Sequence, residues 1–294
     1  MSGVGPLLGA ELRRFFSRRV MVGAFAFGIA LSTMVLVLIT ARSNVRSARQ
    51  TSVQFVCPPG VTADPSSGVS QCAPHPFFTT VSHDHRLKVH ENLSDTIAGS
   101  GVAMVMVAFV IGASFIGAEF AVGSLGSQLI FEPRRVRLVV TKAIAVGIGL
   151  ATLSLALLLY IAVLQLGGSA LRGIVSGLDG PWLAARAGDA LRVSAAVALA
   201  GMTAFAVTVV ARRTVAAVAG LLVFGYVSAI FGSLGHWRWV TRDNPTNALI
   251  ALVVDNHRGG TNLLTVRSGG VAACLWVIGL TAVAAAVFAK REAR

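Results

Sequence analysis

Charged residues are scarce in this sequence. Only 13% of its 294 residues are Asp, Glu, Lys or Arg, whereas 55% are hydrophobic. A soluble domain usually contains about 25% charged and about 45–50% apolar residues. The chain therefore has too few polar groups to cover the surface of a water-facing globule of its size, and this excludes an ordinary soluble domain.

Motifs of nucleotide binding and hydrolysis are also missing. The sequence contains no Gly-x-x-x-x-Gly-Lys phosphate loop, no His-Glu-x-x-His zinc-protease motif and no Gly-x-Ser-x-Gly nucleophile elbow. We therefore expect that the chain is not an enzyme, has no catalytic residues and binds no metal or cofactor itself.

The sequence has instead six apolar stretches, each long enough for a helix that crosses a bilayer core of about 30 Å. None of them contains Asp, Glu, Lys, Arg or His, and a charge at the bilayer centre costs at least about 2.5–3.5 kcal/mol. The sequence thus predicts an all-α, polytopic membrane protein that forms a single membrane domain over residues 1–294. The predicted spans are residues 20–40, 97–118, 143–166, 193–211, 214–234 and 271–289.

Basic residues predict the orientation. Lysine and arginine number 25 against 12 acidic residues, and they concentrate in segments on one side. Residues 1–19, 119–142, 212–213 and 290–294 hold 13 of them in about 50 residues, whereas the opposite loops hold 12 in about 118. Both termini and loop 119–142 are therefore expected in the cytoplasm, with residues 41–96 as an external loop. The net positive charge then reports orientation in a cell membrane and predicts no nucleic-acid partner; the excess of arginine over lysine suggests a bacterial source.

The external loop 41–96 contains two cysteines and four of the six histidines. Cys57 and Cys72 lie where oxidation is possible and allow one intramolecular pairing, so they are the disulfide candidates. His83 and His85 are weak metal candidates, because alternation along a strand places both imidazoles on one side. Their spacing matches no standard zinc pattern, and we expect no metal there.

The N-terminal segment predicts an interfacial helix over residues 6–19. On a helical wheel, one arc is apolar and the other is basic, which suits a helix lying in the headgroup plane with its basic face towards anionic lipid. A plain positive anchor for the first span would use the same residues. The apolar arc comprises Leu8, Leu12, Phe15 and Phe16, and the polar arc comprises Arg13, Arg14, Ser17 and Arg18.

The cytoplasmic loop 119–142 contains an apolar segment between charged flanks. Gly123 breaks the helix that leaves the second span, and Ser124 is a suitable N-cap for a short helix over residues 125–131, which Pro133 ends. Its apolar side chains form a knob that faces the cytoplasm: Leu125, Leu129 and Ile130. Such a knob, rimmed by charge, is typical of a docking surface; an ordinary positive-inside loop explains the arginines but not the apolar helix.

At this loop the sequence resembles the ABC-2 type permeases, the membrane subunits of ATP-binding-cassette exporters. The resemblance rests on Gly117-x-Glu119, Gly123-Ser124-Leu125, Leu129, Pro133-x-Arg135 and Lys142. It implies that residues 125–131 form a coupling helix seated in a groove of the ATPase, and that Glu119, Arg135 and Lys142 organise its base. A Glu119–Lys142 or Glu119–Arg135 ion pair would neutralise the carboxylate at the membrane edge.

The resemblance also implies the partners. These are two copies of a separate ABC ATPase, which binds ATP and Mg²⁺, and a second permease subunit in a homo- or heterodimer. Ion-coupled transporters usually keep ionisable residues inside their spans, whereas these six stretches have none, so the energy is expected from another chain. An ATP-independent carrier or channel, and a membrane sensor that uses loop 41–96, stay open as alternatives.

Overall fold

The computed structural model describes residues 4–42, 50–56, 77–83, 87–124, 128, 130, 134–233, 244–254 and 264–291. Within these residues, five helices are long and apolar enough to cross a membrane. They are α2 (Arg19–Arg42), α3 (Val89–Val122), α5 (Arg135–Arg172), α6 (Gly180–Ala211) and α10 (Val266–Arg291). The helical, multi-pass character expected from the composition is therefore present.

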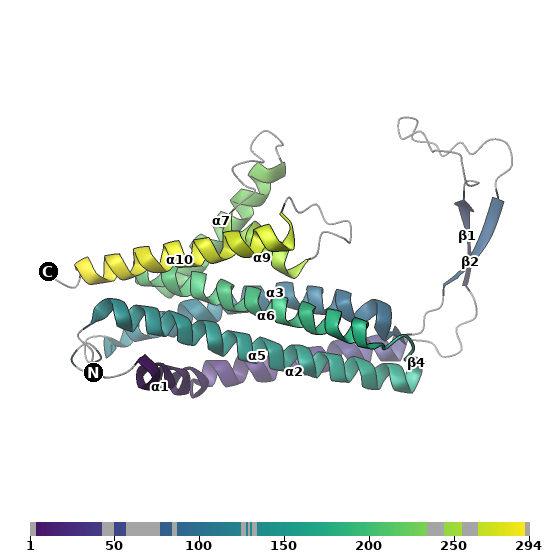
Figure 1. Ribbon diagram of the computed structural model, residues 1–294, viewed down its shortest axis with the longest axis horizontal. Coiled ribbons are helices and arrows are strands. Elements are labelled where there is room, and N and C mark those ends of the chain that lie inside the picture. The colour runs from purple at the N-terminus through teal and green to yellow at the C-terminus, as the bar shows by residue number, and fades with distance from the viewer. Residues whose placement is uncertain are drawn as a thin grey trace.

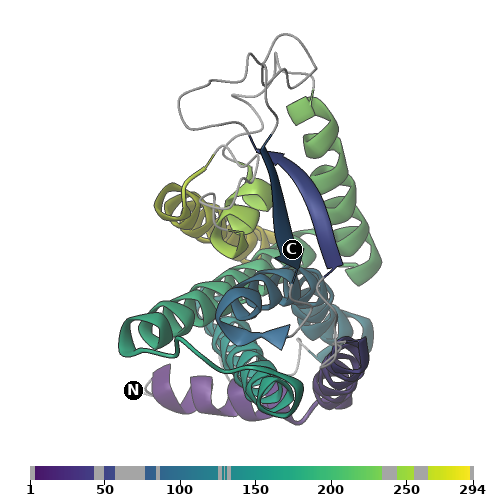
Figure 2. The same ribbon diagram turned by 90° about the vertical axis from the view of Figure 1, so that its right-hand side faces the viewer.

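The sixth predicted stretch lies in α7 (Thr214–Ser233), where a shorter apolar part covers Thr214–Gly225. Figure 1 shows α7 leaning away from the other long helices, and the end-on view of Figure 2 shows the same divergence. The other predicted ranges lie inside helices that are several residues longer, such as α6, which begins at Gly180 rather than near residue 193.

Helix α6 lies at the centre of the bundle. It contacts α3, α5, α7, α10 and the short helix α9 (Pro245–Val253), and two-thirds of its most apolar window is buried, against 6% for α2. Local sequence sets its ends: Asp179 caps it by accepting from the Trp182 N–H, and Arg212 closes it in a left-handed conformation with φ 56°. Helix α2 is thus a peripheral element with a largely exposed surface.

Helix α9 begins with an N-cap and a proline. The Asn244 side chain accepts a hydrogen bond from the Asn247 N–H at 2.7 Å, and Pro245 occupies the first turn. Its apolar side chains are buried among α3, α6 and α10. The segment therefore packs as a short helix against the bundle.

Two small sheets accompany the helices in the described part of the chain. Strands β1 (Gln50–Val56) and β2 (Phe77–His83) form an antiparallel hairpin in register Gln50↔His83, which projects from one end of the bundle in Figure 1. Strands β3 (Leu87–Lys88) and β4 (Gly173–Ile174) pair in parallel. The hairpin gives structure to a range that the sequence treats only as an external loop.

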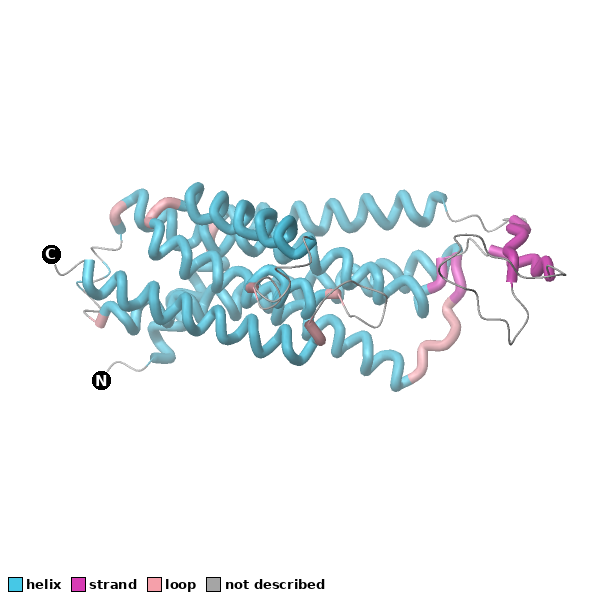
Figure 3. The backbone as a smooth tube through the Cα atoms, turned by 90° about the horizontal axis from the view of Figure 1, so that it is seen from above, coloured by secondary structure: helices cyan, strands magenta, loops and turns pink. Residues whose placement is uncertain are grey.

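The N-terminal helix and the end of the C-terminal helix lie at the same end of the bundle. Helix α1 (Val4–Phe16) and the end of α10 lie opposite the β1–β2 hairpin in Figures 1 and 3. Helix α1 begins two residues earlier and ends three residues earlier than the interfacial segment predicted over residues 6–19. After a turn at Ser17 and Arg18, α2 begins at Arg19.

Candidate functional site

Three ionisable side chains are buried together at the end of the bundle where α1 lies. Glu11 is in α1, Glu119 in the last turn of α3 and Lys142 in α5, and their exposed fractions are 3%, 5% and 0%. Burying a charged group costs on the order of several kcal/mol of free energy unless the group is paired and hydrogen-bonded. Their pairing therefore decides whether this end of the bundle is stable.

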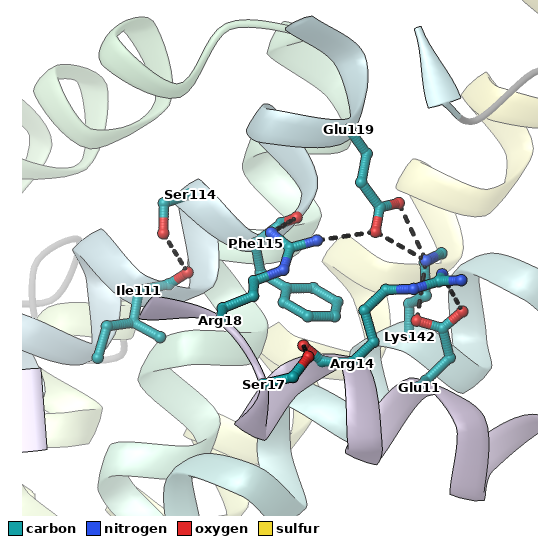
Figure 4. Close-up of polar contacts among 9 residues, drawn as sticks. All are labelled: Glu11, Arg14, Ser17, Arg18, Ile111, Ser114, Phe115, Glu119 and Lys142. Carbon is teal, nitrogen blue, oxygen red and sulfur yellow. Dashed lines mark hydrogen bonds and ion pairs between the residues drawn. The ribbon is translucent and has the colours of Figure 1, made fainter. Parts of the chain in front are cut away.

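Lys142 joins the two carboxylates. Its Nζ lies 2.9 Å from Oε2 of Glu11 and 3.0 Å from Oε2 of Glu119, and Figure 4 shows it between them. The Glu119 carboxylate also sits at a helix C-terminus, where the helix dipole disfavours a negative charge. The ammonium group thus compensates both carboxylates and links α5 to α1 and α3.

Arg18 completes the arrangement from the turn between α1 and α2. Its guanidinium donates to Oε1 of Glu119 at 2.9 Å and to the Phe115 carbonyl oxygen at 2.7 Å, and it lies 4.2 Å from the centre of the Phe115 ring. Burial lowers the pKa of Arg18, and the charge of Glu119 acts in the opposite direction; the group stays protonated. We call Glu11, Arg18, Glu119 and Lys142 the charge cluster; its formal charges sum to zero.

Aromatic packing holds α1 against the charge cluster. Phe15 is fully buried, and its ring centre lies 5.6 Å from that of Phe115. A Cβ atom at Gly149 of α5 would overlap the Phe15 ring, so this glycine makes room for it. At the rim, the half-exposed Arg14 pairs with Glu11 at 3.0 Å.

The predicted orientation of Arg18 in the N-terminal segment is wrong. The sequence places this residue on the basic face towards lipid headgroups, whereas its guanidinium points inward to Glu119 (Figure 4). Glu11 was missed altogether. Glu11 follows the periodicity of the buried Phe15, because residues four apart share one helical face. Arg18 lies beyond the end of α1 at Phe16, in the turn that leads to α2, so the helical wheel does not apply to it. Of the other residues predicted on this helix, Arg13 and Arg14 are exposed, Leu12 is partly buried and Phe16 is 42% exposed.

The structure describes the two ends of the predicted coupling loop 119–142 but little of its tip. Of the two expected partners for Glu119, the structure brings Lys142 to it, while Arg135 begins α5 and is partly buried. Gly123 follows α3 with φ +71°, a left-handed conformation that suits glycine, and Ser124 comes next. The tip residues Leu125, Leu129 and Pro133 lie outside the described residues, as do Cys57, Cys72 and His85; His83 ends β2.

The charge cluster contains two carboxylates, one ammonium group and one guanidinium group. Within the described ranges, no group of three or more His, Cys, Asp or Glu side chains could hold a metal ion. The cluster joins three segments that lie far apart in sequence and stands beside the connection from α3 to α5. Its ion pairs link α1, α3 and α5 to one another at this end of the bundle.

Replacing Arg18 with alanine is expected to lower the free energy of unfolding by about 1.5–3 kcal/mol, the range for hydrogen bonds to charged groups. Thermal unfolding in detergent micelles measures this loss, and hydrogen exchange of α1 amides should rise with it. Arg13→Ala is the matched control, because this arginine is exposed in the neighbouring helix α1. Equal effects of the two substitutions would contradict the role of Arg18.

No family model matches this chain, and no curated protein matches it.

Proposed function

We propose that this chain is the membrane-spanning permease subunit of an ATP-binding-cassette transporter of the ABC-2 type, an exporter driven by a separate ATPase. The observation that carries the proposal is the charge cluster. It ties the N-terminal helix to both sides of the α3–α5 connection through Lys142, at 2.9 and 3.0 Å from its two carboxylates. A permease needs a joint at this place, because its partner pushes on this connection.

The apolar spans support an external energy source. In the described residues, the buried carboxylates and the buried lysine gather at one end of the bundle, outside the apolar stretches that would cross the bilayer. Proton- and ion-coupled carriers usually place such groups within the membrane. In this proposal the partner ATPase binds ATP and Mg²⁺, and the permease binds neither.

The proposed topology has six spans, with both termini in the cytoplasm of a bacterial cell. Helix α1 and the end of α10 lie at the same end of the bundle (Figure 3), which supports an even number of membrane crossings. The basic segments 1–19, 119–142 and 290–294 then face the cytoplasm, as the positive-inside rule requires. The β1–β2 hairpin lies outside.

The proposed coupling begins at the connection between α3 and α5. Val122 and Ile130 in this stretch are 81% and 80% exposed, and apolar side chains so exposed favour contact with a partner. When two ATPase copies close on ATP, they would push residues 125–131. The charge cluster would pass this movement to α1, α3 and α5, and the interface with a second permease subunit would change between two arrangements.

The test begins with a search for an ABC ATPase reading frame next to that of this chain, and continues with co-expression of the two proteins. We expect a complex that hydrolyses ATP, and we expect Leu125→Asp with Leu129→Asp to reduce its yield at least about tenfold, because charges in an apolar contact remove its central binding energy. Leu171→Asp is the control, because this leucine is 84% exposed at the opposite end of α5 and should leave the complex intact.

Two results would overturn the proposal. One is failure of the ATPase to copurify with the unaltered chain. The other is a double aspartate variant whose complex and ATP hydrolysis equal those of the unaltered chain.

A further inference from the structure

A cavity of about 460 Å³ lies between α2, α3 and α5. This size falls within the range of about 300–1,000 Å³ that is usual for small-molecule sites. One stripe of α3 lines it at helical spacing: Thr96, Gly99, Ser100, Ala103, Met104, Val107, Ala108 and Ile111. At 1.5 Å per residue, this stripe is about 22 Å long, so the cavity is elongated along the bundle.

The described lining of the cavity has no charged side chain, and its polar side chains lie chiefly at one end. None of the described residues around the cavity is Asp, Glu, Lys, Arg or His. At the polar end lie Gln165, near the end of α5, and Thr96, near the beginning of α3. This end of the cavity is on the side of β4. The opposite end is lined by apolar residues such as Met21, Ile111 and Leu150.

Gln165 brings an unsatisfied acceptor to this polar end. Its side chain is 3% exposed, and its amide nitrogen donates to the Thr96 hydroxyl. Its Oε1 atom, by contrast, is buried and has no hydrogen-bond partner. A buried acceptor without a partner is costly, and a ligand with an O–H or N–H donor would satisfy it.

The outer wall of the cavity is the peripheral helix α2. Its Phe27 and Leu31 line the cavity and are 66% and 46% exposed. Because α2 packs loosely on the bundle, a hydrocarbon chain can enter sideways from the membrane. No charged group is present in the described lining to hold an ionic headgroup.

We propose that this cavity binds a neutral amphiphile with one hydrocarbon chain and a hydroxyl or amide headgroup. The headgroup donates to Gln165 Oε1, and the chain follows the α3 stripe towards Ile111. If the proposed function holds, this is the class of molecule that the permease exports; this last step rests on the proposed function, whereas the binding site does not.

The test uses the full chain in phosphatidylcholine nanodiscs without any ATPase. The probe is a monoacylglycerol with a photoactivatable diazirine in its chain, and the comparison probe is the methyl ester of the same fatty acid, which has no donor. We expect saturable labelling of α3 and α5 peptides by the monoacylglycerol, with half-saturation about tenfold lower than for the ester.

Two variants assign the labelling to the cavity. Gln165→Leu should weaken monoacylglycerol binding about tenfold and leave the ester unchanged. Gly99→Leu should abolish saturable labelling by both, because Gly99 lines the cavity and a Cβ there meets nothing within 4 Å. Gly279→Leu in α10, equally open but away from the cavity, is the control for the added side chain. Thermal unfolding checks that all three variants fold.

Unsaturable labelling, or equal labelling by both probes in the unaltered chain and in Gln165→Leu, would mean contact with bulk lipid only and would overturn the site. Because no ATPase is present, this result leaves the proposed function standing. Conversely, saturable labelling together with failure of the ATPase to copurify keeps the site and rejects the transporter.

Discussion

Replacing Lys142 with methionine is expected to lower the free energy of unfolding by about 3–5 kcal/mol, the largest loss expected from any single polar side chain described here. Methionine fills a similar volume but leaves Glu11 without its lysine and Glu119 with Arg18 alone. Both carboxylates are at least nine-tenths buried. Thermal unfolding of the purified chain in micelles measures the loss, and hydrogen exchange should show that α1 opens first.

The origin of this loss can be separated from the loss of packing. If uncompensated carboxylates cause it, Glu11→Gln and Glu119→Gln added to Lys142→Met should restore a large part of the stability, because the buried negative charges are then gone. Lys290→Met is the control, since Lys290 is exposed near the end of α10. A Lys142→Met protein as stable as this control would contradict the description of the charge cluster.

The apolar helices could be predicted because membrane insertion imposes a simple rule on the sequence. Long stretches without ionisable residues lie inside long helices. The ends of these helices could not be found in the same way. Helix α3 begins at Val89 and contains Asn92, Ser94 and Asp95 before its apolar part; hydropathy detects the apolar length, whereas the helix continues as far as its hydrogen bonds and packing support it.

The Glu119–Lys142 pair could be predicted because the two residues flank one connection between neighbouring helices. The contribution of Glu11 could not, because its partner is 131 positions away and a carboxylate in an amphipathic segment is ordinarily assigned to solvent. The β1–β2 hairpin had a usable signal. Its strands, Gln50–Val56 and Phe77–His83, are rich in the β-branched and aromatic residues that favour strands.

Replacing Gly112 with alanine is expected to lower the free energy of unfolding by about 3 kcal/mol, at the upper end for overpacked sites. Gly112 of α3 faces Gly201 of α6, and a Cβ atom at Gly112 would overlap the Gly201 carbonyl oxygen. A backbone atom cannot rotate away as a side chain can, so the two helices must separate. Because α6 is the central helix of the bundle, the separation also loosens contacts of α6 with α5 and α10.

The matched control for this effect is Gly188→Ala, which lies in α6, the other helix of the same contact. A Cβ atom at Gly188 meets nothing within 4 Å, so alanine there should stabilise the chain by about 0.5–1 kcal/mol through its better helix propensity. The two substitutions thus make the same chemical change with opposite expected signs, and thermal unfolding distinguishes them. Close backbone approach through small residues is the usual basis of helix association in membranes, where lipid leaves no hydrophobic driving force between helices. A Gly112→Ala protein as stable as Gly188→Ala would therefore mean that side-chain packing, and not this backbone contact, sets the distance between α3 and α6.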